Sequence, residues 1–500
     1  MPLWAELLVV AAGGYGHAVS FSNTSLWWLQ LLALAVLAWR VQRCPTAARA
    51  AACGWVFGTA WLVGATWWLY ISMHDYGLLP APLAAAAVLL LAAFLSLYLA
   101  AAMALYHRVA AASRLWSAPL FAAAWLLGEL ARGYLFTGFP WAASGYAHVD
   151  GPLATLAPWV GVYGIGFVAA WLAAALGGLT KASARPRAWA PLLSALGLCV
   201  AASGVNHGFT VPTGKLTVAL LQGNVPQDEK FSQNGLAQAL QWYADELEAA
   251  TADLVITPET AIPLLPQQLP ADYWQGRLQH FVKTETAALV GIPLGDFETG
   301  YTNSVLGLAR ARAEPYRYDK HHLVPFGEFI PLGFRWFVNL MNMPLGDFSR
   351  GSRNPPSFPV QGERVAPNIC YEDLFGEELA VRFGQLEQAP TIFANISNIA
   401  WFGNTVAVYQ HLQISRMRAL EFQIPMLRAT NTGATAIIDH TGRVTQELKP
   451  FTRGVLTGPV QGRTGLTPFA RWASAAGLWP LLVLGLALLG AAFVWRRRAA

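Results

Sequence analysis

The 500-residue chain is 55% hydrophobic, contains 21 Trp and has a mean hydropathy of +0.38, which is unusual for a soluble protein and predicts a membrane protein. Its charges are unevenly distributed: residues 1–210 hold 9 Lys or Arg and 4 Asp or Glu, whereas residues 211–465 hold 20 and 24. The second region is slightly acidic, so the formal net charge of +5 belongs to the membrane region and the C-terminal tail. This distribution argues against nucleic acid as a partner.

Apolar stretches of the length that a bilayer requires, about 20 residues per helix, dominate the first 210 residues. We predict eight membrane spans, near residues 3–20, 24–40, 53–72, 82–106, 117–132, 153–179, 188–205 and 476–495. The first stretch carries Glu6 and lacks a basic residue, so we expect a retained helix and not a cleaved signal peptide.

Basic residues follow the second, fourth, sixth and eighth predicted spans, whereas the alternate loops at 21–23, 73–81 and 133–152 have no Lys or Arg. The positive-inside rule then places both termini in the cytoplasm and the large segment after the seventh span outside it. We predict a membrane bundle at 1–210, an extramembrane catalytic domain at 211–465, and an eighth span with a basic tail at 466–500.

The extramembrane region alternates short apolar strands with amphipathic helices, which is typical of an α/β fold. Strands are expected at 216–222, 253–257, 288–292, 302–309, 364–370, 390–396, 424–429 and 435–439. Helices are expected at 234–251, 273–286 and 408–422.

Cys370 ends one of these apolar runs and is followed directly by polar residues, in the order Val365-Ala366-Pro367-Asn368-Ile369-Cys370-Tyr371-Glu372-Asp373. The other three cysteines, Cys44, Cys53 and Cys199, lie in or beside apolar segments, so Cys370 has no disulfide partner in the extramembrane region. An inert buried thiol is the alternative interpretation.

Two more polar residues follow strand-like runs: Glu259 after Asp253-Leu254-Val255-Ile256-Thr257-Pro258, and Lys320 after Tyr316-Arg317-Tyr318-Asp319. Reactive residues of open α/β sheets gather at strand ends. A carboxylate there can take the thiol proton, the thiolate can attack a carbonyl, and an ammonium can stabilise the oxyanion and lower the pKa of the cysteine.

Glu259, Lys320 and Cys370 resemble, in order and spacing, the Glu-Lys-Cys triad of the nitrilase superfamily. With eight predicted spans and the motifs Gly223-Asn224-Val225-Pro226-Gln227 and Trp401-Phe402-Gly403, the whole chain is similar to the apolipoprotein N-acyltransferases of Gram-negative bacteria. The resemblance implies a nitrilase-like α-β-β-α sandwich joined to a membrane bundle of the bacterial inner membrane, with the catalytic domain on the periplasmic side.

The resemblance also implies an activity: transfer of a fatty acyl chain from a phospholipid, typically from sn-1 of phosphatidylethanolamine, to the α-amine of a diacylglyceryl-cysteine apolipoprotein. Glu259 would be the general base, Cys370 the nucleophile of a ping-pong reaction through a thioester, and Lys320 the stabiliser of thiolate and oxyanion. Glu328, Tyr371 and Glu372 match further residues that the family needs. We expect no cofactor and a monomer.

Two positions depart from the family pattern. Phe231 follows Lys230 where relatives usually have Trp, so an aromatic side chain for a packing or lid role is retained. Ile399 stands where relatives usually have Asp, which puts any role of that acid in doubt but does not affect the triad.

Aromatic segments supply candidate substrate-contacting or lid residues: Phe231, Trp141, Tyr146, Trp336, Phe337, Met341 and Trp401. The stretch 136–146 is either an interfacial aromatic belt or a wall of a lipid cleft, and the stretch 334–345 is either a core helix or an arm that enters the outer leaflet.

Ionisable residues in two other places allow more than one interpretation. Glu129, inside a predicted span, has a functional or helix-pairing role, or forms a pair with Arg132 that snorkels to the outer face. His321 and His322 are adjacent and would point in opposite directions on an extended chain, so we predict no metal site there or elsewhere.

Two rival functions remain at this stage. A membrane-anchored amidase or nitrilase would use the same triad with water, although one anchor would suffice for it. A transporter or receptor would need more ionisable residues in its spans than Glu129.

Overall fold

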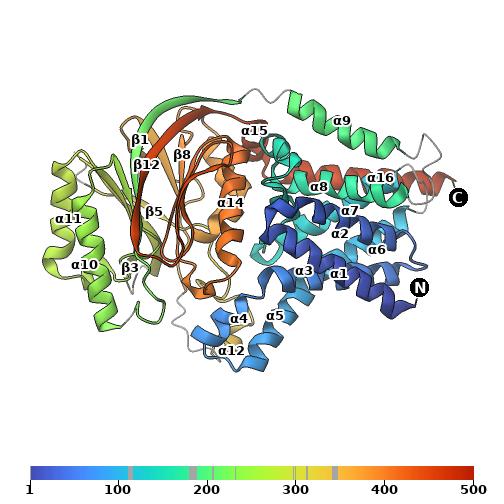
Figure 1. Cartoon of the computed structure of the whole chain (residues 1–500), viewed down its shortest axis with the longest axis horizontal. Helices are drawn as coiled ribbons and strands as arrows, with labels where there is room; N and C mark the ends of the chain where they lie inside the picture. The colour runs from blue at the N-terminus through green and yellow to red at the C-terminus, as the bar shows by residue number, and fades with distance from the viewer. Residues whose placement is uncertain are drawn as a thin grey trace. The chain divides into compact units, whose positions relative to one another are not determined.

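The computed structural model describes residues 2–110, 116–179, 189–204, 208–230, 232–296, 298, 300–310, 314–339 and 347–499. The chain forms two compact units (Figure 1). The first unit comprises Met1–Tyr70, Ala81–His207 and Ala476–Ala500, and the second comprises Ile71–Pro80 and Gly208–Ala475. The short segment Ile71–Pro80, part of a predicted span and its loop, therefore groups with the second unit.

Within the described residues, the first unit is built from helices. The longer ones are α1 (Leu3–Ser22), α2 (Trp27–Val41), α3 (Ala47–Thr66), α5 (Ala81–Leu95), α6 (Leu97–Ala110), α7 (Ser117–Tyr134), α8 (Ala157–Gly178), α9 (Ala190–Gly204) and α16 (Trp479–Ala499). Small residues let these helices approach closely, as in many membrane bundles. A Cβ atom at Gly54 of α3 would lie 2.7 Å from the carbonyl oxygen of Leu99 in α6.

Fewer helices than predicted are long and apolar enough to cross a membrane. The described residues contain three, Thr24–Val41, Ala81–Val109 and Pro152–Gly178, or up to five if each of two bent helix pairs is one span. The predicted number of eight spans is therefore not confirmed. Helices α1 and α7 occupy two other predicted positions, but they carry buried ionisable side chains, among them Glu6 and Glu129, which make them less apolar.

The second unit contains two six-stranded sheets. The first has the order β12-β1-β2-β3-β4-β5, and the second has the order β11-β10-β9-β8-β7-β6. The first sheet consists of β1 (Thr210–Gln222), β2 (Leu254–Ile256), β3 (Ala287–Asp296), β4 (Gly300–Leu308), β5 (Tyr316–Asp319) and β12 (Gly454–Gly465). The second consists of β6 (Phe358–Val360), β7 (Glu363–Ile369), β8 (Ile392–Ser397), β9 (Met426–Thr430), β10 (Thr435–Ile438) and β11 (Val444–Leu448).

Alternating side chains build the layers of this unit. In β1, Val218 and Leu220 enter the core that also contains Ile369 and Ile396 of the other sheet, whereas Leu221 enters a second core under the helices α10 (Gln233–Ala249) and α11 (Ala271–Lys283). A third core joins the second sheet to α13 (Gly376–Ala380), α14 (Ala407–Phe422) and α15 (Pro468–Ala476). The helices flank the paired sheets in Figure 1, so the predicted α/β sandwich is confirmed for this unit.

The strand directions explain where a site can form. Strands β1, β2 and β3 are parallel to one another in the first sheet, and β7, β8 and β9 are parallel to one another in the second. The carboxyl ends of parallel strands meet at one edge of a sheet, and polar residues that follow these strands are brought there.

Candidate active site

Cys370 lies directly after β7 and begins a 3-10 turn that ends at Leu374. Its backbone has φ of +51°, a left-handed conformation that is costly for a residue with a side chain and persists only where the surroundings enforce it. Two donors hold its carbonyl oxygen: Nδ2 of Asn395 at 3.1 Å and Nε2 of His411 at 3.3 Å. The turn therefore presents a partly buried thiol at the end of the strand.

Glu259 and Lys320 meet beside a third charged group, Glu328. Nζ of Lys320 lies 3.3 Å from Oε1 of Glu259 and 2.9 Å from Oε1 of Glu328. Nδ2 of Asn303, on β4, donates to both of these oxygens at 2.7 Å. The other oxygen of Glu259 accepts the backbone N–H of Asn398 at 2.9 Å. Two carboxylates therefore share the Lys320 ammonium and the Asn303 amide donor.

The charges of this cluster set the protonation states. Burial would raise the pKa of Glu259, but the Lys320 ammonium and the amide donors hold it below its ordinary value. Burial would lower the pKa of Lys320, but the Glu328 and Glu259 carboxylates raise it. Both groups are therefore charged at neutral pH, as a base and an electrostatic stabiliser must be.

Burial and neighbouring charges act in opposite directions on the Cys370 thiol. Burial raises the pKa of Cys370 well above its ordinary value, the Glu259 carboxylate raises it further, and Lys320 opposes this increase. Lys320 lowers the pKa of Cys370, as predicted for a neighbouring ammonium, but burial and the acidic neighbours outweigh this effect. A neutral thiol attacks a carbonyl only as a base takes its proton, and an ionised carboxylate can be such a base.

Glu372 joins the turn of Cys370 to the segment that carries Lys320. One carboxylate oxygen accepts the Ile369 N–H at 2.7 Å and the Tyr318 hydroxyl, and the other accepts the His321 and His322 N–H groups at 2.7 and 3.2 Å. The Glu372 side chain therefore connects the backbone just before Cys370 to the backbone just after Lys320. Glu372 therefore lies where a positioning residue is expected.

Tyr371 is buried against aromatic rings. Its ring centroid lies 5.7 Å from that of His322 and 5.3 Å from that of Phe375. The His322 ring stacks on Phe375 and bonds Glu378, whereas Nδ1 of His321 bonds the Gly351 carbonyl at 2.9 Å. The rings of the two histidines therefore have different hydrogen-bond partners.

Lys230 is a second lysine near the triad that the sequence singled out only as the neighbour of Phe231. Its buried Nζ donates to Oγ1 of Thr260, the residue that follows Glu259, at 2.5 Å. Burial lowers the pKa of Lys230 to about 8, and Glu259 opposes this shift. Asn303 was also missed, because a single amide within a strand pattern carries no distinctive signal.

The proposed lid residues occupy different surroundings. Trp336 is 64% exposed on the short helix α12 (Arg335–Val338), and the neighbouring Phe337 contacts Phe326 with ring centroids 5.9 Å apart. Trp401 contacts Tyr76 with centroids 5.7 Å apart within the second unit. The remaining two in this unit, Phe231 and Met341, lie outside the described residues.

Trp141 and Tyr146 are buried within the first unit, against Trp68 and Phe21 respectively. Their assignment to lipid contact stays a prediction.

Glu129 is fully buried in the same unit, so it does not snorkel to a surface. Its carboxylate accepts the Ser144 N–H at 2.8 Å and Nε1 of Trp125 at 2.9 Å, and it pairs with Arg132 at 3.4 Å. Arg132 also donates to the Phe139 carbonyl at 2.6 Å. The pair therefore fastens α7 to the segment that follows it, in agreement with a pairing role.

Comparison with known proteins matches both regions of the chain. Residues 13–175 match the family described as apolipoprotein N-acyltransferase N-terminal domain, and residues 217–469 match the carbon-nitrogen hydrolase family. The chain is 56% identical to the apolipoprotein N-acyltransferase of Verminephrobacter eiseniae, covering 95% of this chain and 93% of the relative. It is 50% identical to the apolipoprotein N-acyltransferase of Ralstonia nicotianae, covering 97% and 92%.

A solved carbon-nitrogen hydrolase from Helicobacter pylori is 13% identical, with a TM-score of 0.36 over 54% of this chain and 94% of that one. This structural likeness is too distant to support an argument about the site.

Proposed function

This chain belongs to the apolipoprotein N-acyltransferase family, and from that premise we propose that it transfers a fatty acyl chain from a phospholipid to an apolipoprotein. The donor position is the sn-1 ester of phosphatidylethanolamine. The acceptor is the N-terminal α-amine of a diacylglyceryl-cysteine. The observation that carries the proposal is the buried cluster in which Nζ of Lys320 contacts Glu259 and Glu328, and which Glu372 joins to the turn that presents Cys370.

In the first half-reaction, Glu259 takes the proton of Cys370 as the sulfur attacks the ester carbonyl carbon. Lys320 stabilises the negative charge on the carbonyl oxygen in the tetrahedral intermediate. The bond between that carbon and the glycerol oxygen breaks, and Glu259 returns its proton to the glycerol oxygen. A lysophospholipid leaves and the acyl chain remains on Cys370 as a thioester.

In the second half-reaction, the neutral α-amine of the apolipoprotein attacks the thioester carbon. Glu259 takes the amine proton, the carbon–sulfur bond breaks, and the proton passes to the departing Cys370 thiolate. An amide forms and the thiol is restored, so the reaction is of the ping-pong type.

The supporting residues keep this constellation in place. Glu328 and Asn303 surround the Lys320 ammonium, and Glu372 ties the Lys320 segment to the Cys370 turn. Tyr371 packs the turn against His322 and Phe375.

We further propose eight membrane spans with both termini in the cytoplasm, a catalytic unit in the periplasm, and a monomeric enzyme of the bacterial inner membrane. The alternation of loops with and without Lys or Arg supports this orientation. The exposed Trp336 and the neighbouring Phe337 support a lipid-contacting arm that also includes Met341, with Phe231, Trp141, Tyr146 and Trp401 as further substrate or lid contacts.

The test is intact-protein mass spectrometry of the purified enzyme with phosphatidylethanolamine and no acceptor, followed by a diacylglyceryl-cysteine peptide. We expect a mass gain of one acyl chain that is absent in Cys370→Ser and that moves to the peptide amine. An adduct that decays in water without modifying the peptide would indicate a hydrolase. The absence of any adduct would contradict the proposed chemistry.

A further inference from the structure

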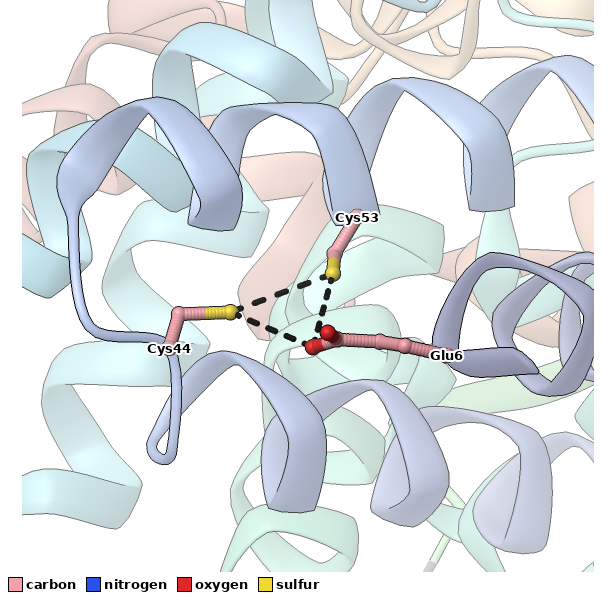
Figure 2. Close-up of side chains that lie close together, drawn as sticks. All are labelled: Glu6, Cys44 and Cys53. Carbon is pink, nitrogen blue, oxygen red and sulfur yellow. Dashed lines mark hydrogen bonds between the residues drawn. The ribbon is translucent and has the colours of Figure 1, made fainter. Parts of the chain in front are cut away.

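Three potential metal ligands from separate segments meet inside the first unit, away from the triad residues in the sequence. Glu6 lies on α1, Cys44 follows α2, and Cys53 lies on α3. Figure 2 shows their carboxylate and thiol groups pointing toward one another. All three side chains are buried, and no spacing pattern in the sequence connects them.

The distances between the donor atoms match a tetrahedral site. Oε1 of Glu6 lies 3.6 Å from the sulfur of Cys44 and 3.6 Å from that of Cys53, and the two sulfurs are 3.9 Å apart. Around Zn²⁺, with Zn–S of about 2.3 Å and Zn–O of about 2.0 Å, tetrahedral corners are separated by about 3.8 Å for two sulfurs and about 3.5 Å for sulfur and oxygen. The three atoms therefore have the spacing of one face of a zinc tetrahedron, and the fourth corner is left for a further ligand.

The charges allow a cation to enter. NH2 of Arg40 lies 2.6 Å from Oε1 of Glu6, and Nε of Arg49 lies 2.6 Å from Oε2. A divalent cation that displaces the two thiol protons leaves the total charge of the site unchanged, when the cation is counted with the two arginines, the carboxylate and the two sulfurs. Metal binding then exchanges two protons for two positive charges, which avoids the cost of an added buried charge.

The surroundings also hold the ligands in position. Both arginines orient the carboxylate, Arg40 through the ligand oxygen Oε1 and Arg49 through Oε2, as outer partners do in metal sites. The carbonyl oxygen of Cys44 lies 2.8 Å from Nε2 of His107, which fixes the backbone of this cysteine. The loop that carries Cys44, and the start of α3 that carries Arg49, are on the side that we place in the cytoplasm, where thiols stay reduced.

We propose that Glu6, Cys44 and Cys53 form a binding site for a thiophilic divalent cation of the Zn²⁺ type, which ties α1 to the α2–α3 connection. Thiolate ligands select such a cation over Mg²⁺ or Ca²⁺. The cation joins three segments that are held together otherwise by helix packing and by the ion pairs of Glu6, so it stabilises the first unit. This site is separate from the acyl-transfer chemistry and does not depend on it.

The test is elemental analysis of the full-length enzyme in detergent and reductant, after equilibration with Zn²⁺ and removal of the excess. We expect about one Zn²⁺ per chain in the wild type, and the loss of that equivalent in Cys53→Ser. Cys199→Ser and Cys370→Ser are the matched controls, because each removes one thiol elsewhere and should keep the zinc. Acyl-enzyme formation on Cys370 shows that Cys53→Ser is folded.

A second readout uses Co²⁺ as the probe. The wild type should develop thiolate-to-cobalt charge-transfer absorption that Zn²⁺ abolishes and that Cys53→Ser lacks. Zn²⁺ should also raise the Tm of the wild type and of Cys199→Ser but not that of Cys53→Ser. A wild type without retained zinc, or equal zinc in Cys53→Ser, would overturn the proposal and leave the two thiols as hydrogen-bond donors to Glu6.

Discussion

Asn303 donates to two carboxylates at once, and these two carboxylates share the ammonium of Lys320. Removal of the Asn303 amide leaves Glu259 with fewer hydrogen-bond donors, so the pKa of Glu259 should rise. Since Glu259 acts as a base only when ionised, acylation is lost as the pH falls through this pKa. We expect Asn303→Ala to slow acylation about tenfold, the effect of one lost hydrogen bond to a charged group, and to move the acid limb of the profile to higher pH.

The measurement is the rate of acyl-enzyme formation across the acid range, followed by quenched mass spectrometry. Thr302→Ser, which keeps a hydroxyl on the neighbouring residue of β4, is the control and should leave the profile in place. An unshifted acid limb in Asn303→Ala would show that this amide does not tune Glu259.

Burial of Lys230 makes the stability of the protein depend on pH. Its pKa is lowered to about 8 by burial, so the folded state disfavours its charged form. The unfolded chain binds more protons between pH 8 and the ordinary lysine pKa of about 10.4, so the stability of the wild type should rise with pH across this window. We expect Lys230→Met to lack this rise.

Thermal unfolding in detergent from pH 7 to pH 10.5 measures the difference between the two proteins. Below pH 8 the full cost of the buried charge is present, and the advantage of Lys230→Met over the wild type should be largest there. Lys283→Met, at an exposed position at the end of α11, should run parallel to the wild type. A constant difference between wild type and Lys230→Met at every pH would contradict the assigned burial effect.

At the scale of elements, side chains of α14 bind the 3-10 helix that begins at Cys370, directly after β7. Nε2 of His411 lies near two acceptors, the Cys370 carbonyl and Oδ1 of Asp373 at 3.0 Å, so this nitrogen carries the proton. The hydroxyl of Ser415 donates to the other oxygen of Asp373 at 2.5 Å, and Arg428 donates to that hydroxyl at 2.6 Å. This buried network enforces the left-handed backbone of Cys370.

His411→Phe should therefore disturb the backbone conformation of Cys370 while the thiol itself is kept. We expect kcat to fall about tenfold, the value of about one lost hydrogen bond near a charged network, with little change of KM for the phospholipid. Tyr409→Phe, on the exposed side of the same helix, should keep wild-type kcat. If both variants have the wild-type kcat, the network serves only stability.

The elements that carry the triad could be predicted because each has a strong local signal. Apolar runs ended by polar residues indicated the strands before Glu259 and Cys370, and the structure has β2 and β7 there. The edge strands β11 and β12 were missed because they are half-exposed and rich in glycine and polar residues, and only pairing with β10 and β1 orders them.

Contacts between distant segments were harder to predict for a physical reason. Asn303 meets Glu259 only after β3 and β4 pair, and Glu6 meets the two cysteines only after α1 packs on α3. The spacing of residues in the sequence does not indicate which distant side chains come into contact. The charges that act on the pKa of Cys370 also follow several different strands. The sequence therefore indicated that Lys320 lowers this pKa, but not that the net shift is upward.

At the scale of the whole molecule, the proposed function requires the second unit to obtain a phospholipid from the membrane. Leu332, Phe334 and Trp336 are large apolar side chains with exposed fractions of 101%, 45% and 64%, in one short segment between Lys320 and Cys370. Exposed apolar surface of this kind favours contact with a bilayer or with acyl chains. We expect Trp336→Ser to raise the KM for phospholipid by about tenfold, the loss of one buried aromatic contact worth about 1.5 kcal/mol, and to leave Tm unchanged because the side chain supports no core.

A short-chain water-soluble ester separates lipid capture from chemistry, because its acyl group needs no membrane. Acylation of Cys370 by this donor should be equal in wild type and Trp336→Ser, whereas transfer from phospholipid vesicles should differ. Leu386→Ser, a change at another exposed apolar residue, should resemble the wild type with both donors. If Trp336→Ser is equally slow with the soluble ester, the segment supports the catalytic residues and not lipid capture, because only the chemical step is common to both donors.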